Sequence, residues 1–485
     1  MNSITTEEKN NWVTKIILLL FAAYVLFLVA LNIYVVINES MLKYLILVLP
    51  VWLGCIFIAY RFRVSPKIFI IGILTASFIL KGITVAMNNI EPVSDFKMFY
   101  DCAVALYKGN TGWSKWTYFS DWAYQTGPIA YYALLMKIFG TGLLPLKLCN
   151  CALMAGTNVL IYLIARKITN EGAARAAALL YLFYPAPYFL APVLTNQHFA
   201  AFMFFAAIYI FMAVRMNIVV KGLLCGVITA LANVLRPLGL LIFAALILWV
   251  IFQIIRTRKL VTLVLASIML VTFMLTTWSV SAYFVSSGIS PYGLSNNFPL
   301  WKFVVGLNEQ TSGQYSLEDQ TKIFYMEDKA QRDIVAKRVI KERLSIGFNR
   351  MLEFMVKKQE VMWASTDTLR WGYYVVKDNG LVPQDSIKHI EHRLIKSEKI
   401  YYTLAMVLMF IGIIYIIWRR KKMNSLSLYI IFLLMAFYSV HLLIEVQVRY
   451  RYFAMICVYI LISYGISFFA EICAPKANKW ENRPQ

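Results

Sequence analysis

Long apolar runs alternate with short polar connections along most of the 485 residues. The hydrocarbon core of a bilayer is about 30 Å thick, so a helix needs about 20 mostly apolar residues to cross it. Runs of this length, or close to it, recur through the chain. The pattern predicts an all-α polytopic membrane protein with about twelve transmembrane helices, at residues 13–36, 43–60, 67–87, 144–165, 174–190, 196–214, 219–235, 237–255, 260–283, 399–418, 426–444 and 452–470.

Composition agrees with this pattern. Hydrophobic residues make up 60% of the chain and charged residues 15%, whereas a soluble domain has about 25% charged residues. The first apolar run is too long for the core of a signal peptide, and no small-residue cleavage site follows it, so we interpret it as an uncleaved first helix. The seven cysteines fall mostly inside apolar runs without ligand spacing, which indicates small buried side chains.

The net charge of +22 is concentrated in short clusters at the ends of apolar runs. Under the positive-inside rule such clusters mark cytoplasmic loops, whereas a nucleic-acid surface would place them along one soluble face. We therefore expect a multi-pass cell-membrane protein with both termini cytoplasmic and no nucleic-acid partner. The clusters are Arg61, Arg63 and Lys67; Arg166, Lys167 and Arg175; Arg215 and Lys221; Arg256, Arg258 and Lys259; and Arg419 to Lys422.

Residues 127–140 form an apolar stretch of only 14 residues that includes Lys137. Counting this stretch as a span would invert every later loop and place Arg256 and the 419–422 cluster outside. An interfacial helix keeps the charge rule intact. Residues 88–143 are then a first outer loop, where outer means extracytoplasmic.

Three regions follow from this topology. Residues 1–285 form an N-terminal transmembrane module that includes the loop 88–143, residues 286–397 form an extracytoplasmic loop domain, and residues 398–485 form the C-terminal helices. The loop domain holds 13 of the 25 acidic residues. Apolar residues recur at helical spacing over about 318–360, which predicts a small helical domain facing water.

Asp95 is the first candidate for chemistry, because it stands in the first outer loop beside Phe96. A carboxylate against apolar surface gains basicity and can accept a proton from a hydroxyl. The alternative is a helix cap formed by Ser94 or Asp95. Glu91 and Asp101 are nearby carboxylates, and Asp101, one and a half helical turns further on, need not share the face of Asp95.

Arg236 is the second candidate, as the only charged residue between Gly222 and Ile255. An isolated charge at a membrane span is a functional-site hypothesis by default, and a guanidinium suits the phosphate of a lipid carrier. The alternative is a side chain that extends to the outer headgroups.

A third group lies in residues 441–453, where His441 and Glu445 are four residues apart and Arg449 and Arg451 follow. An acid and two arginines at one outer rim suit an anionic headgroup, although an ordinary interfacial belt is the alternative. His198 forms a polar patch with Asn196 and Gln197. This patch either binds sugar or only marks the start of a helix. The sequence contains no phosphate-binding Walker loop, no GxSxG turn and no CxxC pair, so ATP-driven and serine-hydrolase chemistry are unsupported.

The order of several motifs resembles the GT-C superfamily of membrane glycosyltransferases, over about residues 67–470. The likeness is greatest to bacterial members of the protein O-mannosyltransferase and aminoarabinose transferase group (family 39-like). The motifs are SDFKMFYD, YQTGPIAYYALLMKIFG, LIYLIARKI, GAARAAALLYLFYP, VLTNQHFAAFMFF, ANVLRPLG, GLNEQTSGQYSLED and EVQVRYRYF.

This resemblance implies an inverting transfer of a sugar from a polyprenyl-phosphate carrier to an acceptor outside the cytoplasm. It implies Asp95 as the catalytic base, and Arg236, Arg449 and Arg451 as ligands of the carrier phosphate. The substrate contacts expected of Glu91, Asp101, His198 and Glu445 complete the candidate site. Some relatives use a divalent cation and others do not, so a cation stays an option. The chain departs from many relatives at Thr126-Gly127-Pro128, where they have His-Pro.

Two other functions compete with this interpretation. A flippase or transporter of lipid-linked sugars would predict inverted repeats or interrupted helices with polar residues at mid-membrane, and the sequence has neither. A polysaccharide polymerase or ligase would use a pyrophosphate carrier, for which more arginines are expected in the large loop. The sugar and the acceptor, whether a wall polymer, a glycolipid or a protein, stay open.

Overall fold

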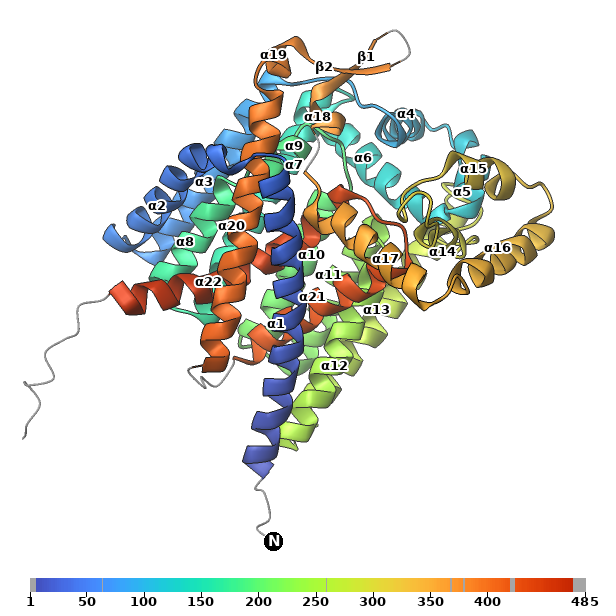
Figure 1. Cartoon of the computed structure of the whole chain (residues 1–485). Coiled ribbons are helices and arrows are strands. Elements are labelled where there is room, and N and C mark those ends of the chain that lie inside the picture. Colours follow the sequence, from blue (N-terminus) through green and yellow to red (C-terminus); the bar gives the residue numbers. More distant parts are fainter. Residues whose placement is uncertain are drawn as a thin grey trace, which may run out of the picture.

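The computed structural model describes residues 6–62, 64–258, 260–366, 369–377, 380–418 and 424–473. Within these ranges the chain is almost entirely helical (Figure 1), which confirms the predicted class. Ten helices are long and apolar enough to cross a membrane. They are α1 (Thr6–Asn38), α2 (Leu45–Arg61), α3 (Pro66–Met87), α7 (Leu143–Ile168), α11 (Ile218–Leu235), α12 (Gly239–Thr257), α13 (Val261–Ser286), α20 (Glu391–Trp418), α21 (Ser425–Leu443) and α22 (Arg451–Cys473).

Two of the twelve expected spans take another form in the described residues. Residues 174–190 divide into α8 (Glu171–Leu182) and α9 (Pro185–Leu190). The break falls at Tyr184, whose backbone is extended, because a residue before proline is disfavoured in the helical conformation. The stretch 196–214 becomes α10 (Gln197–Ala213), which is apolar but only 17 residues long.

Burial separates the central helix of the bundle from the helices at its surface. In α22, 78% of the apolar window is buried inside the protein, against 11% in α13. The helix α22 packs against α20, α8 and α7, and α13 packs mainly against α11. Since lipid is itself apolar, the bare face of α13 is typical of a helix at the lipid boundary.

The elements outside the ten long helices gather largely at one end of the bundle, opposite the start of α1 (Figure 1). After α3 come α4 (Asp95–Tyr107), α5 (Thr117–Asp121) and α6 (Thr126–Phe139). After α13 come α14 (Trp301–Gly306), α15 (Leu317–Asp319), the π-helix η4 (Gln320–Phe324), α16 (Lys329–Leu344), α17 (Phe348–Gln359), the π-helix η5 (Glu360–Ala364), α18 (Arg370–Tyr373), the antiparallel strands β1 (Tyr374–Lys377) and β2 (Gly380–Pro383), and α19 (Asp385–Lys388). The remaining short 3-10 helices are η1 (Leu42–Tyr44), η2 (Gly112–Lys115), η3 (Ala123–Gln125) and η6 (Val448–Tyr450).

A buried ion pair joins the elements between α3 and α7 to those between α13 and α20. The Arg332 guanidinium on α16 bonds both oxygens of Asp121, at 2.6 and 3.2 Å, and lies 3.8 Å from the centre of the Phe298 ring. Asp121 is fully buried and Arg332 is 1% exposed. The segments between α3 and α7 and between α13 and α20 are therefore in direct contact.

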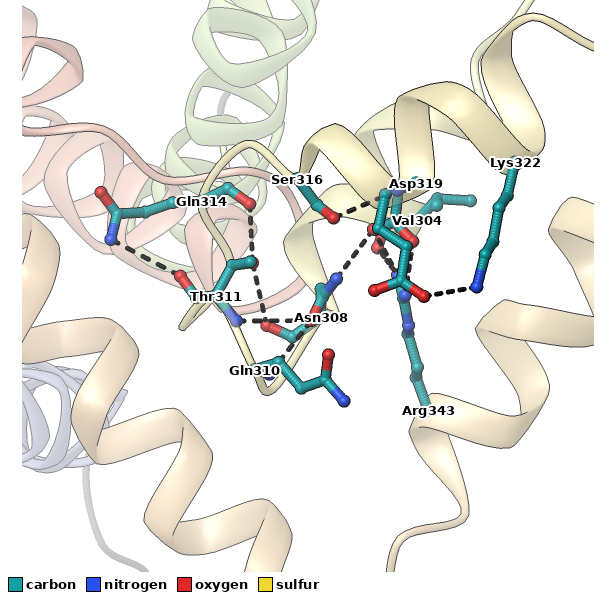
Figure 2. A network of polar contacts seen from close by, with 10 residues as sticks. Val304, Asn308, Gln310, Thr311, Gln314, Ser316, Asp319, Lys322 and Arg343 are labelled. Carbon is teal, nitrogen blue, oxygen red and sulfur yellow. Dashed lines mark hydrogen bonds and ion pairs between the residues drawn. The ribbon is translucent and has the colours of Figure 1, made fainter.

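A second polar network folds the segment between α14 and α16 (Figure 2). The side chains of Asn308, Ser316 and Arg343 point toward Asp319. Asn308 Nδ2 and Arg343 Nη2 donate to its carboxylate at 2.8 and 2.7 Å, and Ser316 Oγ accepts its backbone N–H at 3.1 Å. This network belongs to the motif GLNEQTSGQYSLED, and it fixes the turn that includes Gly313.

Several basic clusters meet at the opposite end of the bundle. Asn424, just before α21, donates to Lys167 O at 2.8 Å, and Trp249 on α12 donates to Ser425 O at 2.9 Å. Arg175 bonds the backbone carbonyls of Phe62 and Val64, at 3.1 and 2.6 Å. The ends of α2, α7 and α12 therefore carry their positive charge on one side. Arg63, Lys259 and the cluster 419–422 lie outside the described residues.

Candidate active site

The carboxylate of Asp95 is exposed at the first residue of α4. Ser94 before it has φ +54°, a conformation that non-glycine residues seldom adopt. The Ser94 side chain makes no capping hydrogen bond, and its backbone oxygen accepts Lys97 N–H at 3.0 Å. Strained backbone of this kind is often found at functional sites. Phe96, the next residue, is buried at 6% exposure.

Arg449 packs on the ring of Phe96. Its guanidinium carbon is 5.2 Å from the centre of the Phe96 ring and 5.2 Å from that of Trp371, and its Nε donates to Gln447 Oε1 at 2.7 Å. Burial raises the pKa of Tyr118 well above its usual value, with Asp95 adding to the shift and Arg449 opposing it. Asp95 and Arg449 therefore lie within electrostatic range of one phenol, although they are 354 positions apart in the sequence.

Arg236 approaches the same place from the end of α11. Its Nη1 donates to Asn196 Oδ1 at 3.2 Å, and its guanidinium carbon is 5.4 Å from the centre of the Tyr450 ring. Asn196 in turn donates to Leu235 O at 2.7 Å. Burial lowers the pKa of Arg236 to about 10, while Tyr450 opposes the shift, so the side chain is positive at neutral pH. Its hydrogen-bond acceptor Asn196 is neutral, while the Glu445 carboxylate acts on the guanidinium electrostatically.

Glu445 organises the residues around both arginines. Its carboxylate pairs with Lys302, accepts Gln447 Nε2 at 2.7 Å and accepts the Tyr450 hydroxyl at 3.2 Å. Burial alone would raise the pKa of Glu445, but the Lys302 ammonium more than offsets it, so the pKa is lowered and the carboxylate is ionised. Through Gln447 and Tyr450, Glu445 sets the positions of Arg449 and Arg236.

Two glycines allow the backbone contacts that hold these elements. A Cβ at Gly306 would lie 2.2 Å from the backbone carbon of Ile444, and a Cβ at Gly127 would lie 2.1 Å from Val234 O. The first contact lets α14 dock against the connection that carries Glu445. The second brings α6 against the end of α11, where Arg236 follows. The Thr-Gly-Pro departure thus has a physical reason, because a side chain at position 127 would collide with α11.

Two predicted substrate contacts are engaged inside the protein. Arg451 is 1% exposed, pairs with Glu398 at 3.4 Å, and donates to Ser365 O at 3.1 Å. His198 is fully buried, with Nδ1 at 3.0 Å from the Tyr452 hydroxyl and Nε2 at 3.1 Å from Leu190 O. Both ring nitrogens of His198 therefore have protein partners. The substrate roles of these two residues stay predictions.

The other two predicted carboxylates lie away from Arg449. Asp101 pairs with Lys97 at 3.2 Å, and both side chains are more than half exposed. Glu91 is exposed and acts on Tyr100, whose pKa is raised by burial and then by Glu91. In the described part of the chain, no three histidine, cysteine, aspartate or glutamate residues lie close enough to hold a metal ion.

Sequence reasoning missed several residues of this cluster: Tyr118, Lys302, Trp371 and Gln447. Lys302 and Trp371 come from the large loop, and only their contacts with Glu445 and Arg449 reveal them. A lysine between tryptophan and phenylalanine, in LWKF, was the available signal for Lys302.

The fold and this cluster define a polytopic helical membrane protein that resembles the GT-C type glycosyltransferases, as the motifs predict. Residues 127–284 match the family model described as dolichyl-phosphate-mannose-protein mannosyltransferase. Among solved structures, the apo oligosaccharyltransferase of Archaeoglobus fulgidus is similar at 10% identity with a TM-score of 0.41. That match covers 82% of this chain and 51% of the other. No curated protein sequence is similar enough to count as a match.

Proposed function

We propose that the protein is an inverting glycosyltransferase that moves a sugar from a polyprenyl-phosphate carrier to an extracytoplasmic acceptor. The acceptor would be a cell-wall polymer, a glycolipid or a protein. The observation that carries the proposal is that Arg449 packs on the ring of Phe96, the residue next to Asp95, and that both charges act on Tyr118. An exposed carboxylate and a guanidinium held by a neutral partner are what proton removal and phosphate binding require.

The reaction is a single displacement. The acceptor oxygen attacks the anomeric carbon while its proton passes to an Asp95 carboxylate oxygen. The bond between that carbon and the carrier phosphate breaks, and the bonding electrons stay on the phosphate. Arg449 and Arg236 stabilise the charge that accumulates there. Attack from the face opposite the leaving group inverts the anomeric centre.

The distribution of charge supports an extracytoplasmic site. Arg166, Lys167 and Arg175 lie at one end of the bundle, and Asp95 and Arg449 lie at the other. With the basic end cytoplasmic, both termini are cytoplasmic and the site faces outward. An activated lipid phosphate as donor removes the need for a nucleotide on that side.

The test is sugar transfer by the purified protein in liposomes, from a panel of radiolabelled undecaprenyl-phosphate hexoses and pentoses. We expect Asp95→Asn to lower the transfer rate by about 10²- to 10⁴-fold, the contribution typical of a general base. Glu353→Gln is the matched control, because that carboxylate is exposed on α17 and contacts no residue of the site.

Equal transfer by Asp95→Asn and wild type would support the glycosyltransferase activity but would assign the general base to another carboxylate. No transfer from any donor in the panel would favour a lipid-linked sugar flippase, or a polymerase that uses a pyrophosphate carrier.

A further inference from the structure

An open pocket lies along α4 on the side away from Arg449. It has a volume of about 630 Å³, and Ser94, Lys97, Asp101, Asn110, Trp113 and Trp116 are among the residues that line it. The helix supplies one wall and the segment around η2 supplies the other. None of these residues takes part in the arginine cluster described above.

The aromatic wall is rigid but presents an accessible ring. Trp113 is buried, donates its indole N–H to Asn110 O at 3.0 Å, and packs edge-on against Phe119 with ring centres 5.0 Å apart. Trp116 is 54% exposed and packs on Phe119 from another side, with ring centres 6.3 Å apart. The pocket therefore has a fixed aromatic base and an indole that faces solvent.

The polar groups of the pocket supply both donors and acceptors. Lys97 and Asp101 pair at 3.2 Å, yet their side chains are 57% and 54% exposed. Asn110 Oδ1 accepts Gly112 N–H at 2.9 Å, which holds its amide in the wall. The lysine charge is balanced by the aspartate, so the pocket favours a neutral polar ligand over a strongly anionic one.

The position of Asp95 relates this pocket to the arginine cluster. Successive residues of a helix are rotated by about 100°. Ser94 lines the pocket and Phe96 contacts Arg449, so Asp95 stands between the two sites on the surface of α4. In a single displacement the attacking oxygen and the leaving phosphate lie on opposite sides of the anomeric carbon. The acceptor must therefore bind on the side of Asp95 opposite the arginines, which is where this pocket lies.

We infer that this pocket binds a sugar unit of the acceptor, so that the acceptor carries a glycan. The inference rests on the proposed function. A pyranose presents a face of C–H bonds, which packs on an exposed indole, and hydroxyl groups that both donate and accept hydrogen bonds. Trp116 provides the first contact, and Lys97, Asp101 and Asn110 provide the second.

The experiment measures sugar binding without donor, so it does not depend on transfer. The full-length protein in lipid nanodiscs is titrated with mannotetraose, chitotetraose, maltotetraose and a serine- and threonine-rich peptide, and saturation-transfer NMR is recorded. We expect one of the sugars to bind, and its Kd to rise about tenfold in Trp116→Ala. Trp278→Ala is the control, because that tryptophan is 69% exposed on α13 and outside the pocket.

Asn110→Ala is a second pocket variant that leaves the tryptophans in place, and it should also weaken sugar binding. Asp95→Asn should keep sugar binding while losing transfer, which separates this inference from the proposed function. If a diglucosyl lipid included in the nanodiscs binds the protein more tightly than the soluble sugars do, the acceptor is a glycolipid. If the lipid and the soluble sugars bind equally, the acceptor is a polymer. The inference is overturned if no sugar binds at about 10 mM, if only the peptide binds, or if Trp116→Ala binds as wild type does.

Discussion

Arg449 and Arg451 are two residues apart, yet they occupy opposite environments. Arg451 is buried, faces the Tyr402 ring at 4.4 Å and pairs with the buried carboxylate of Glu398. Arg449 is half-buried, and Phe96, Trp371 and the neutral amide of Gln447 hold it. The first arginine has its countercharge inside the protein. The second has a neutral hydrogen-bond partner, and the carboxylate of Glu445 acts on it across the intervening Gln447.

This difference separates a structural cation from one that is ready for a ligand. A phosphate at Arg451 would have to displace Glu398 and leave a buried carboxylate without its partner, which is costly. A phosphate at Arg449 displaces no carboxylate. Two arginines that look alike in VRYRYF therefore acquire different roles from their surroundings.

The largest expected effect concerns the stability of the buried pair. Glu398→Ala removes one partner and leaves the Arg451 charge buried, so we expect the free energy of unfolding to fall by about 3–5 kcal/mol. Thermal unfolding in detergent, followed by size-exclusion chromatography, measures the change. The double variant Glu398→Leu, Arg451→Met should recover most of the loss. A single variant with the wild-type Tm would remove the contrast between the two arginines.

The next effect concerns catalysis. In the proposed reaction Arg449 stabilises the leaving phosphate, so we expect Arg449→Ala to lower kcat by about 10²- to 10³-fold, with Tm nearly unchanged. Transfer in liposomes and the same unfolding assay measure the two quantities. A large loss of stability with unchanged kcat would mean that Arg449, like Arg451, is a structural cation.

A smaller effect is expected at the residue that positions both cations. Glu445→Gln keeps the hydrogen bonds of an amide but removes the charge that pairs with Lys302. We expect about a tenfold loss of kcat/KM for the lipid donor, the magnitude typical when a supporting residue is lost. A shift in donor KM at unchanged kcat would indicate a role in binding alone. Unchanged kinetics would mean that Gln447 and Tyr450 hold the arginines without help.

The smallest effect is a dependence of stability on pH. The Lys358 ammonium is buried on α17 and bonds two backbone carbonyls, those of Gly306 and, at 2.9 Å, Leu442. Burial lowers its pKa to about 7 from 10.5, while Glu445 opposes the shift. Between these values the unfolded chain holds a proton that the folded protein has released, so stability rises with pH.

We expect a gain of about 1 kcal/mol in the free energy of unfolding from pH 7 to pH 8. The Tm of wild type and Lys358→Met at both pH values measures it, and the variant should lose this part of the slope. A wild-type Tm that falls as the pH rises would contradict the prediction.

The sequence predicted the helical membrane fold because apolar length is sufficient to define a span. In the described residues, two of the twelve expected spans are shorter than the ten long helices. Pro185 and Pro187 divide one run into α8 and α9, and the short α10 follows directly. The amphipathic stretch 318–360 was predicted as helical, and the structure divides it at Tyr325 and again at Ser345, shortly before Gly347 with φ +89°.

The candidate site was predictable in part. Asp95, Arg236, Glu445 and Arg449 were identified as rare charges beside apolar runs, and the structure places them around Phe96 and Tyr450. Arg451 and His198 followed the same sequence logic, yet their partners Glu398 and Tyr452 lie in other helices and engage them internally. Lys302 and Trp371 were missed because distant contacts, not local pattern, bring them to the site.

The ion pair between Asp121 and Arg332 has a consequence for how this architecture can be recombined. Each residue belongs to a different outer segment, and each is almost fully enclosed. A chimera that exchanges only one segment with a relative lacking the matching charge would strand a buried ion, at a cost of about 3–5 kcal/mol. The two segments should therefore be inherited, and engineered, together.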